Sequence, residues 1–511
     1  MRSEATLKNS IWGIIQQVIV CVMSLFSRRV MLETIGVEGV GLNAFLNSVI
    51  TMLSLAELGI GSALVYHMYA PIAVNDEEHI AQLMRTYKNV YRIIASVIML
   101  IGLSLLPFMD KIVKDVSYSK SYVSLIFVLF LIQTTSSYLF TYKRSMLSAD
   151  QKQYVITIYD LGYKIVTITV GIIILKLTGE LAWYLLMLIF CTVTENVLIS
   201  RKVDRLYPFI NRYREYPEKS EMMKIAADVK NIFIGKVSGV VTNSTDSVLI
   251  NMFVGTVQNG LYSNYNIILG TLLAALRQFS DAMRGSIGNL VAVESKEHID
   301  LVFQRLMFIM FFIASFCACC LTGLIDPFIN IIFGRGLLLD RIIVYVCILN
   351  LYMSTITIPA LNMVTASGLF SFDKYISLAG TVINLIISVI LGKSIGMAGI
   401  LIGTSSTYII QFILKVILLY NNYLHISCVK IFAKNIVFAL ITVAECALVN
   451  YTSGLVSSGN EFISFIIIGV ISCAIPIFIN TALFFRTVEF KYSFDLLNGI
   501  RKKLLNSRRK K

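Results

Sequence analysis

Charged side chains are scarce in this sequence. Lys, Arg, Asp and Glu make up 14% of the 511 residues, whereas hydrophobic residues make up 57% and the mean hydropathy is +0.76. So large an apolar excess cannot be buried inside one water-soluble globule, and the chain must therefore use lipid as its solvent. Composition excludes an ordinary soluble domain.

The sequence also lacks the elements that membrane pumps and membrane enzymes need. The phosphate-binding pattern G-x-x-x-x-G-K-[ST] does not occur, and the segments between apolar runs are too short for a nucleotide domain, which argues against an ATP-driven pump. A glycosyltransferase or polymerase would need a sizeable external loop or an external carboxylate pair. Glu33 and Glu38 lie in the first external segment, but no larger domain accompanies them. We expect no enzymatic activity and no cofactor.

The tightest cysteine cluster, Cys317, Cys319 and Cys320, lies within an apolar helix. There we expect small packing residues and no metal ligands. The first apolar run has no small-residue cleavage site and is followed by further spans, so we expect a retained first helix rather than a signal peptide.

Apolar runs of about 18 to 25 residues recur along the whole chain, and each is long enough to cross roughly 30 Å of hydrocarbon as a helix. The pattern predicts an all-α polytopic membrane protein with about 14 transmembrane helices. The predicted helices begin near Asn9, Gly41, Val90, Tyr122, Val155, Leu181, Lys230, Leu261, Leu301, Arg341, Tyr375, Met397, Ile431 and Phe462.

The net charge of +14 is explained by membrane topology, because the basic residues lie in short breaks between apolar runs and not on one face. With a cytosolic N-terminus, about 29 of the 44 Lys and Arg residues fall in cytosolic segments, about nine outside and about six within spans. We therefore expect both termini in the cytosol and no nucleic-acid partner. The four histidines lie near cytosolic span ends, where we expect solvated side chains.

An internal repeat with an offset of roughly 220 residues links the two halves of the chain. The spacing of Gly36, Gly41, Leu42 and Asn47 recurs in Gly255, Gly260, Leu261 and Asn266. Since each unit holds about six helices, an even number, the copies are parallel and related by an axis along the membrane normal. The predicted organisation is an N-terminal lobe (1–200), a basic cytosolic linker (201–229), a C-terminal lobe (230–425), two additional helices (426–486) and a basic cytosolic tail (487–511).

Polar residues at helical spacing mark the candidate cavity wall, because a polar side chain in hydrocarbon is costly and should face another helix or water. The substrate-binding candidates are Arg28, Arg29, Asn47, Lys164, Lys236, Asn243 and Arg277. The candidates for ion coupling or gating are Glu57, Asp160, Asp246 and Asp281.

Simpler interpretations exist for some of these residues. Asp160 with Lys164, and Arg277 with Asp281, are helical neighbours that neutralise each other if they pair. Arg28, Arg29 and Lys236 have long stems, with which they can reach the headgroups. Glu57 and Asp246 are harder to dismiss because their stems are short. Other acids and bases in the spans that have no partner along the sequence are Glu195, Glu445 and Lys415.

Several segments resemble the polysaccharide repeat-unit flippases of the multidrug/oligosaccharidyl-lipid/polysaccharide superfamily, which also contains the peptidoglycan-precursor flippases. The resemblance covers nearly the whole chain, and its most telling parts are IGVEGVGL (35–42), LSLAELGIGSA (53–63), DSVLINMFVGTVQNGLYSNYN (246–266) and NLIISVILGKSIGMAGILIG (384–403).

The resemblance implies two six-helix lobes around a cavity, with the last two helices forming a groove for a long isoprenoid chain. By position, it also implies that Arg28, Arg29 and Arg277 contact pyrophosphate. The function it implies is flipping of undecaprenyl-pyrophosphate-linked oligosaccharides across the bacterial cytoplasmic membrane for capsule, O-antigen or exopolysaccharide synthesis. The expected partners are this lipid-linked oligosaccharide, membrane lipids, polysaccharide polymerase and other assembly proteins. An ion-coupled multidrug or cation antiporter of the same superfamily is the alternative.

Overall fold

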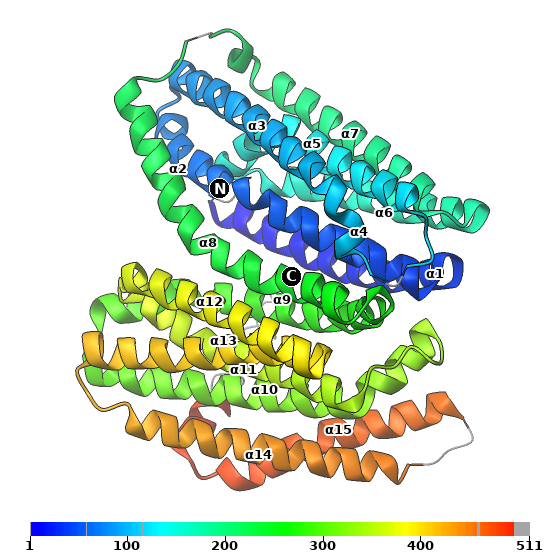
Figure 1. Ribbon diagram of the computed structural model, residues 1–511. Helices are drawn as coiled ribbons and strands as arrows, with labels where there is room; N and C mark the ends of the chain where they lie inside the picture. Colours follow the sequence, from blue (N-terminus) through cyan, green and yellow to red (C-terminus); the bar gives the residue numbers. More distant parts are fainter. Residues whose placement is uncertain (1, 58, 115, 214, 457–459, 495–511) are drawn as a thin grey trace, which may run out of the picture. The chain divides into compact units, whose positions relative to one another are not determined.

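The computed structural model describes residues 2–57, 59–114, 116–213, 215–456 and 460–494. Throughout these residues the secondary structure is helical (Figure 1). The N-terminal helices are α1 (Arg2–Leu53), η1 (Ser54–Glu57), α2 (Ile60–Ala73), α3 (Glu77–Leu105), η2 (Leu106–Phe108), α4 (Met109–Ile112), α5 (Lys120–Ala149), α6 (Gln153–Thr178), α7 (Leu181–Leu206) and η3 (Pro208–Asn211). The later helices are α8 (Lys219–Phe253), α9 (Thr256–Val293), α10 (Lys296–Phe333), α11 (Arg341–Ala366), α12 (Phe370–Ile395), α13 (Met397–Leu419), η4 (Tyr420–Leu424), α14 (Val429–Gly454) and α15 (Glu461–Phe484).

Ten helices in the described part of the chain are long and apolar enough to cross a membrane. The remaining long segments are the two halves of α1, which meet at a kink, and the helices α8 and α9, with 35 and 38 residues. These four segments and the ten apolar helices give fourteen crossings. The prediction of an all-α, multi-pass membrane protein with about fourteen spans is confirmed.

The kink in α1 lies at Gly36, whose φ is 67° and ψ is 179°. Residues other than glycine rarely adopt this backbone conformation. Glycine at this position therefore permits the chain to reverse between the first two spans. The second span is itself interrupted. Its α-helix ends at Leu53, passes through one 3-10 turn and resumes at Ile60 after Gly59, where φ is 97°.

Two helix starts differ most from those predicted. Helix α3 begins at Glu77 and not near Val90, and α8 begins at Lys219 and not near Lys230. The extra turns are polar, so an apolar run does not reveal them. Asp76 caps α3 by accepting a hydrogen bond from the His79 backbone N–H at 3.0 Å.

We predicted solvated side chains for the histidines, but two of them have carboxylate partners. The His79 ring lies 2.9 Å from Glu221 Oε1, and the His67 ring lies 3.0 Å from Asp228 Oδ2. His67 lies within α2 and His79 near the start of α3, so the two contacts join α2 and α3 to α8. Their partners are more than 140 residues away in the sequence, which hides them from a reading of local pattern.

The chain divides into two compact units, residues 1–264 and 265–511. The first unit has one large apolar core made by α1, α2, α3, α5, α6 and α7. The second contains a core around Phe303, Tyr352 and Phe412, and a smaller aromatic cluster around Phe308, Phe311 and Phe438. The division into two units does not test the predicted boundaries of the lobes, the linker and the tail. Those boundaries stay a prediction.

The repeated glycines Gly41 and Gly260 meet at a helix crossing inside the first unit. A Cβ at Gly41 would overlap the carbonyl oxygen of Thr256, and a Cβ at Gly260 would overlap that of Val37. Val37 precedes Gly41 by the same four positions by which Thr256 precedes Gly260. The contact is therefore reciprocal, as a local two-fold relation between two copies requires.

A hydrogen bond strengthens this crossing, because Asn259 Nδ2 donates to the Gly41 carbonyl at 3.1 Å. The amide oxygen of the same side chain accepts from Ser247 Oγ at 2.8 Å. Small residues let the two backbones approach closely, and polar side chains join the helices where water is absent. The repeat detected in the sequence thus has a structural role at this crossing.

Candidate functional site

The break in the second span creates a polar pocket in the first unit. The pocket has a volume of about 620 Å³ and is lined by Glu57 and Gly59 at the break, by α2 and by the end of α5. Non-helical backbone at membrane depth is tolerated only where protein buries it or where it lines a cavity. Broken helices of this kind form binding sites in transporters.

Glu57 is the charged residue of this pocket. Its carboxylate lies within electrostatic reach of the hydroxyl groups of Tyr91 on α3 and Tyr138 on α5. Gly59 allows α8 to approach, since a Cβ there would lie 3.0 Å from the Val229 carbonyl oxygen. The arrangement gives a carboxylate with phenolic neighbours in a protein-lined hollow, which suits a proton, a small cation or a gating contact.

The two neighbouring arginines of the first span differ in their surroundings. Arg29 is exposed, and its Nε donates to Glu33 Oε1 at 3.0 Å. Arg28 lies beside Tyr184 of α7, and its Nη1 is buried with no hydrogen-bond partner among the described residues. A guanidinium nitrogen in that situation has a donor available for an anion.

Asp160 pairs through space and not along its own helix. Arg144 on α5 donates to Asp160 Oδ1 at 2.6 Å and to Glu195 Oε1 at 2.7 Å, while its Nε donates to Asn196 at 3.0 Å. Lys164, the helical neighbour of Asp160, is exposed. Asp160 therefore does not pair with Lys164, as the sequence suggested. Packing of α5, α6 and α7 brings the guanidinium group of Arg144 to its carboxylate instead.

Two side chains that have no partner along the sequence have partners in space. Glu195 belongs to the Arg144 cluster, and Lys415 on α13 bonds Asp373 on α12. Burial of a charge is costly unless it is paired, so these contacts are expected once the helices are packed. Sequence reasoning missed Arg144 and Asp373 because each lies near a helix end.

The other candidates are spread over the two units. Asp246 is buried on α8, with 5% of its surface exposed. Asn47 on α1 and Arg277 on α9 are exposed. The side chains of the last three candidates lie outside the described part: Lys236, Asn243 and Asp281. Within the first unit, the structure therefore brings Glu57 into a pocket and buries Asp246 and part of Arg28.

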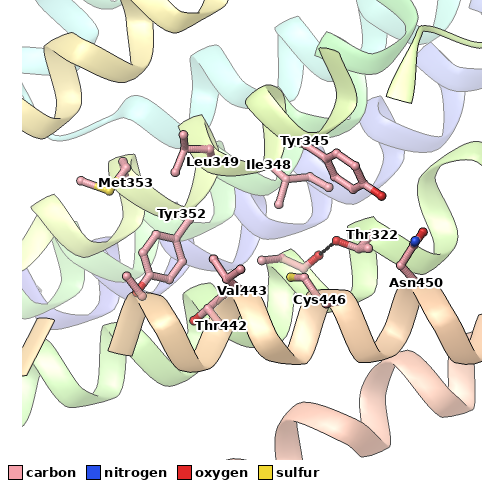
Figure 2. A pocket seen from close by; sticks show the side chains of 13 residues that line it. Thr322, Tyr345, Ile348, Leu349, Tyr352, Met353, Thr442, Val443, Cys446 and Asn450 are labelled. Atoms are coloured by element: carbon pink, nitrogen blue, oxygen red, sulfur yellow. Dashed lines mark hydrogen bonds between the residues drawn. The ribbon is translucent and has the colours of Figure 1, made fainter. Parts of the chain in front are cut away.

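A second pocket lies within the second unit, between α10, α11 and α14 (Figure 2). Its volume is about 480 Å³. Ile348, Leu349 and Met353 of α11 face Val443 of α14 across it. Apolar walls dominate, and the few polar groups are those of Thr322, Tyr345, Tyr352, Thr442, Cys446 and Asn450.

This apolar pocket suits a hydrocarbon chain better than a charged or heavily hydroxylated group. The sequence contains a faint signal for it, because Thr442, Cys446 and Asn450 recur every four residues along an otherwise apolar helix. That spacing places one polar stripe on a single face of α14. Its partners on α10 and α11 are not visible in the sequence.

The chain is similar to known proteins in its structure. No family model matches the sequence, and no curated protein matches it. The lipid II flippase MurJ in an inward closed conformation superimposes with a TM-score of 0.68 at 14% identity, covering 93% of this chain and 98% of MurJ.

Multidrug transporters have the same architecture. A MATE family transporter of the MOP superfamily, in an inward-facing conformation, gives a TM-score of 0.60 at 13% identity and covers 78% of this chain and 96% of its own. The MATE transporter DinF-BH, in a ligand complex, gives 0.55 at 16% identity, with 82% and 95% covered. The chain therefore has the fold of the MOP superfamily of membrane transporters.

Proposed function

We propose that this protein flips undecaprenyl-pyrophosphate-linked oligosaccharide repeat units across the bacterial cytoplasmic membrane, with both termini in the cytosol, for polysaccharide synthesis. The observation that carries the proposal is the apolar pocket against α14. A drug antiporter needs no site for a long hydrocarbon tail, whereas a lipid-linked substrate does. The likeness to MurJ, which covers 93% of this chain, supports the same class of substrate.

The substrate offers two chemically distinct parts, and the chain offers a group for each. The pyrophosphate is a doubly charged anion, and Arg28 has a buried donor to meet it. The isoprenoid tail is apolar, and the pocket of α10, α11 and α14 is lined accordingly. Glu57 and Asp246 serve an ion site or a gate, and the remaining predicted cavity residues stay predictions.

Transport proceeds by alternating access, in which the two six-helix lobes rock about the repeat interface while the tail stays in the bilayer. A gradient or the membrane potential drives it. Moving one elementary charge through 100 mV changes the free energy by about 2.3 kcal/mol, so an anionic pyrophosphate responds to the potential. The negative interior favours its outward movement.

Photo-crosslinking tests where the tail binds. A photoreactive amino acid at Val443, which lines the apolar pocket, should capture a polyisoprenoid-linked oligosaccharide from native membranes. The matched control is Leu448, which is exposed on α14 but does not line the pocket. Capture of the lipid-linked sugar should exceed that at Leu448 several-fold, because one side chain faces the tail and the other does not.

Equal capture at both positions would remove the pocket as the tail site. Capture of a cationic dye at Val443, in place of lipid, would favour the antiporter.

A further inference from the structure

Glu445 is a fully buried carboxyl group at the meeting of three helices. None of its surface is exposed. Ser315 Oγ on α10 donates a hydrogen bond to Glu445 Oε2 on α14, and Asn480 Nδ2 on α15 donates to Ser315 Oγ at 3.4 Å. One chain of hydrogen bonds thus joins α10, α14 and α15.

No positive charge neutralises this carboxyl group in the described part of the protein. Its Oε1 has no hydrogen-bond partner, and neither does the buried Oδ1 of Asn480. An isolated carboxylate in such surroundings is strongly disfavoured relative to the neutral acid. A bound proton removes the charge and supplies a hydrogen-bond donor, so the ligand that this site requires is a proton.

The neighbouring titratable groups supply no cation. They are Cys319 on α10, whose Sγ lies 4.0 Å from Glu445 Oε2, together with Cys446 on α14 and Tyr352 on α11. Helix α15 contributes the neutral groups of Asn480 and Ser472. Any of the titratable neighbours would add negative charge on ionisation, which reinforces the preference for a protonated Glu445.

Packing closes the site on two sides. Toward one end, an aromatic cluster joins the three helices, in which Phe311 and Phe438 stack with centroids 4.2 Å apart and Phe484 meets both edge-on. Toward the other end, Gly323 lets the Ser472 hydroxyl approach the α10 backbone. The proton therefore has no wide path along the helices.

The remaining approach is through α14 itself. Thr442 and Cys446 flank Glu445 on this helix, and both line the apolar pocket (Figure 2). A small rotation or displacement of α14 would bring the carboxyl group toward that pocket. Exchange of the proton with water is thus tied to movement of the helix that forms the pocket wall.

We propose that Glu445 is a proton-binding site whose proton locks α14 onto α10 and α15. When the proton leaves for water at the opened pocket, the carboxylate can no longer remain in the dry interface, and α14 is released. The lock does not depend on the substrate. A further consequence rests on the proposed function: proton release would weaken binding of an isoprenoid tail in the pocket of α10, α11 and α14.

A native cysteine pair reports the state of the lock. Cys319 Sγ on α10 and Cys446 Sγ on α14 lie 3.9 Å apart, so a thiol oxidant can join them when the helices are docked. The test uses the full chain in lipid nanodiscs with the other seven cysteines replaced. A protease site in the loop 334–340 separates the two cysteines, so fragments that stay together without reductant measure cross-linking.

Cross-linking is compared between the chain with Glu445 and the Glu445→Gln variant, which keeps a neutral side chain of the same shape at every pH. The ratio of their yields removes the pH effect on the thiols that both chains share, and it leaves the effect of the Glu445 carboxyl group. The ratio should be near one in acid and fall several-fold as the pH rises, because only the chain with Glu445 acquires a charge.

A ratio that stays constant with pH would overturn the proposal. If Glu445→Gln does not fold, Glu445→Asp takes its place in a second form of the test. This variant still titrates, but its shorter stem withdraws the carboxyl group from the Ser315 hydroxyl and from the helix interface, so its cross-linking should be lost at a pH different from that of the unaltered chain. Identical profiles would again overturn the lock. Because no substrate is present, these outcomes are independent of tail capture at Val443.

Discussion

Polysaccharide export should stop when Arg28 is replaced by alanine, and lysine at this position should restore it only in part. Arg28 has a buried Nη1 without a partner, whereas Arg29 already bonds Glu33 and Arg277 is exposed. Removing one partner of a buried, hydrogen-bonded charge pair costs about 2–5 kcal/mol. That loss corresponds to at least about a 30-fold decrease in affinity for the pyrophosphate.

Lysine tests shape separately from charge. Arginine grips two phosphate oxygens with a rigid fork, while lysine offers a point charge, so Arg28→Lys should retain a minor share of export. The same pairs of changes at Arg29 and Arg277 should have smaller effects. Surface polysaccharide and membrane abundance are measured for all six variants, and resistance to cationic dyes should not change. Normal export in every alanine variant, accompanied by reduced dye efflux, would replace the flippase by the antiporter.

The second large effect is expected at the reciprocal crossing of the repeat. Gly41→Ala and Gly260→Ala should each sharply lower the amount of folded protein, because the added Cβ would overlap a backbone carbonyl and not a flexible side chain. Overpacking typically destabilises by about 1–3 kcal/mol, and here the backbone itself must move. A loss of this size is a large part of the stability of an ordinary domain.

Gly270→Ala is the matched control, since it lies on the same helix as Gly260 and an added Cβ there meets nothing within 4 Å. Alanine in an open helical position should be neutral or slightly stabilising, by up to about 1 kcal/mol. Thermal unfolding of the purified proteins compares the three variants. If Gly41→Ala or Gly260→Ala unfolds at the same temperature as Gly270→Ala, the crossing is not the close contact described.

Features carried by runs of residues could be predicted from the sequence. Length and apolarity gave fourteen helices, and the starts at Leu181, Arg341 and Met397 agree with the structure to the residue. The repeat was visible because its glycines are needed where two backbones touch, so their spacing is preserved in both copies. Polar helical extensions, such as the first turns of α3 and α8, gave no apolar signal and were missed.

Features that depend on which helices pack together could not be predicted. Arg144 holds carboxylates from α6 and α7, and Ser315 reaches Glu445 across 130 positions of sequence. A single sequence contains the charges but not the neighbours that neutralise them. The candidate site was therefore predicted as a set of polar stripes, and the pairing within it came from the structure.

The most direct test of the lipid-linked substrate is a deletion strain in which the repeat units are located. We expect loss of surface polysaccharide and accumulation of undecaprenyl-pyrophosphate-linked repeat units on the cytosolic leaflet, with both defects reversed by the intact gene. Normal surface polysaccharide in the deletion strain, with no repeat units trapped inside and with greater sensitivity to cationic drugs, would contradict it.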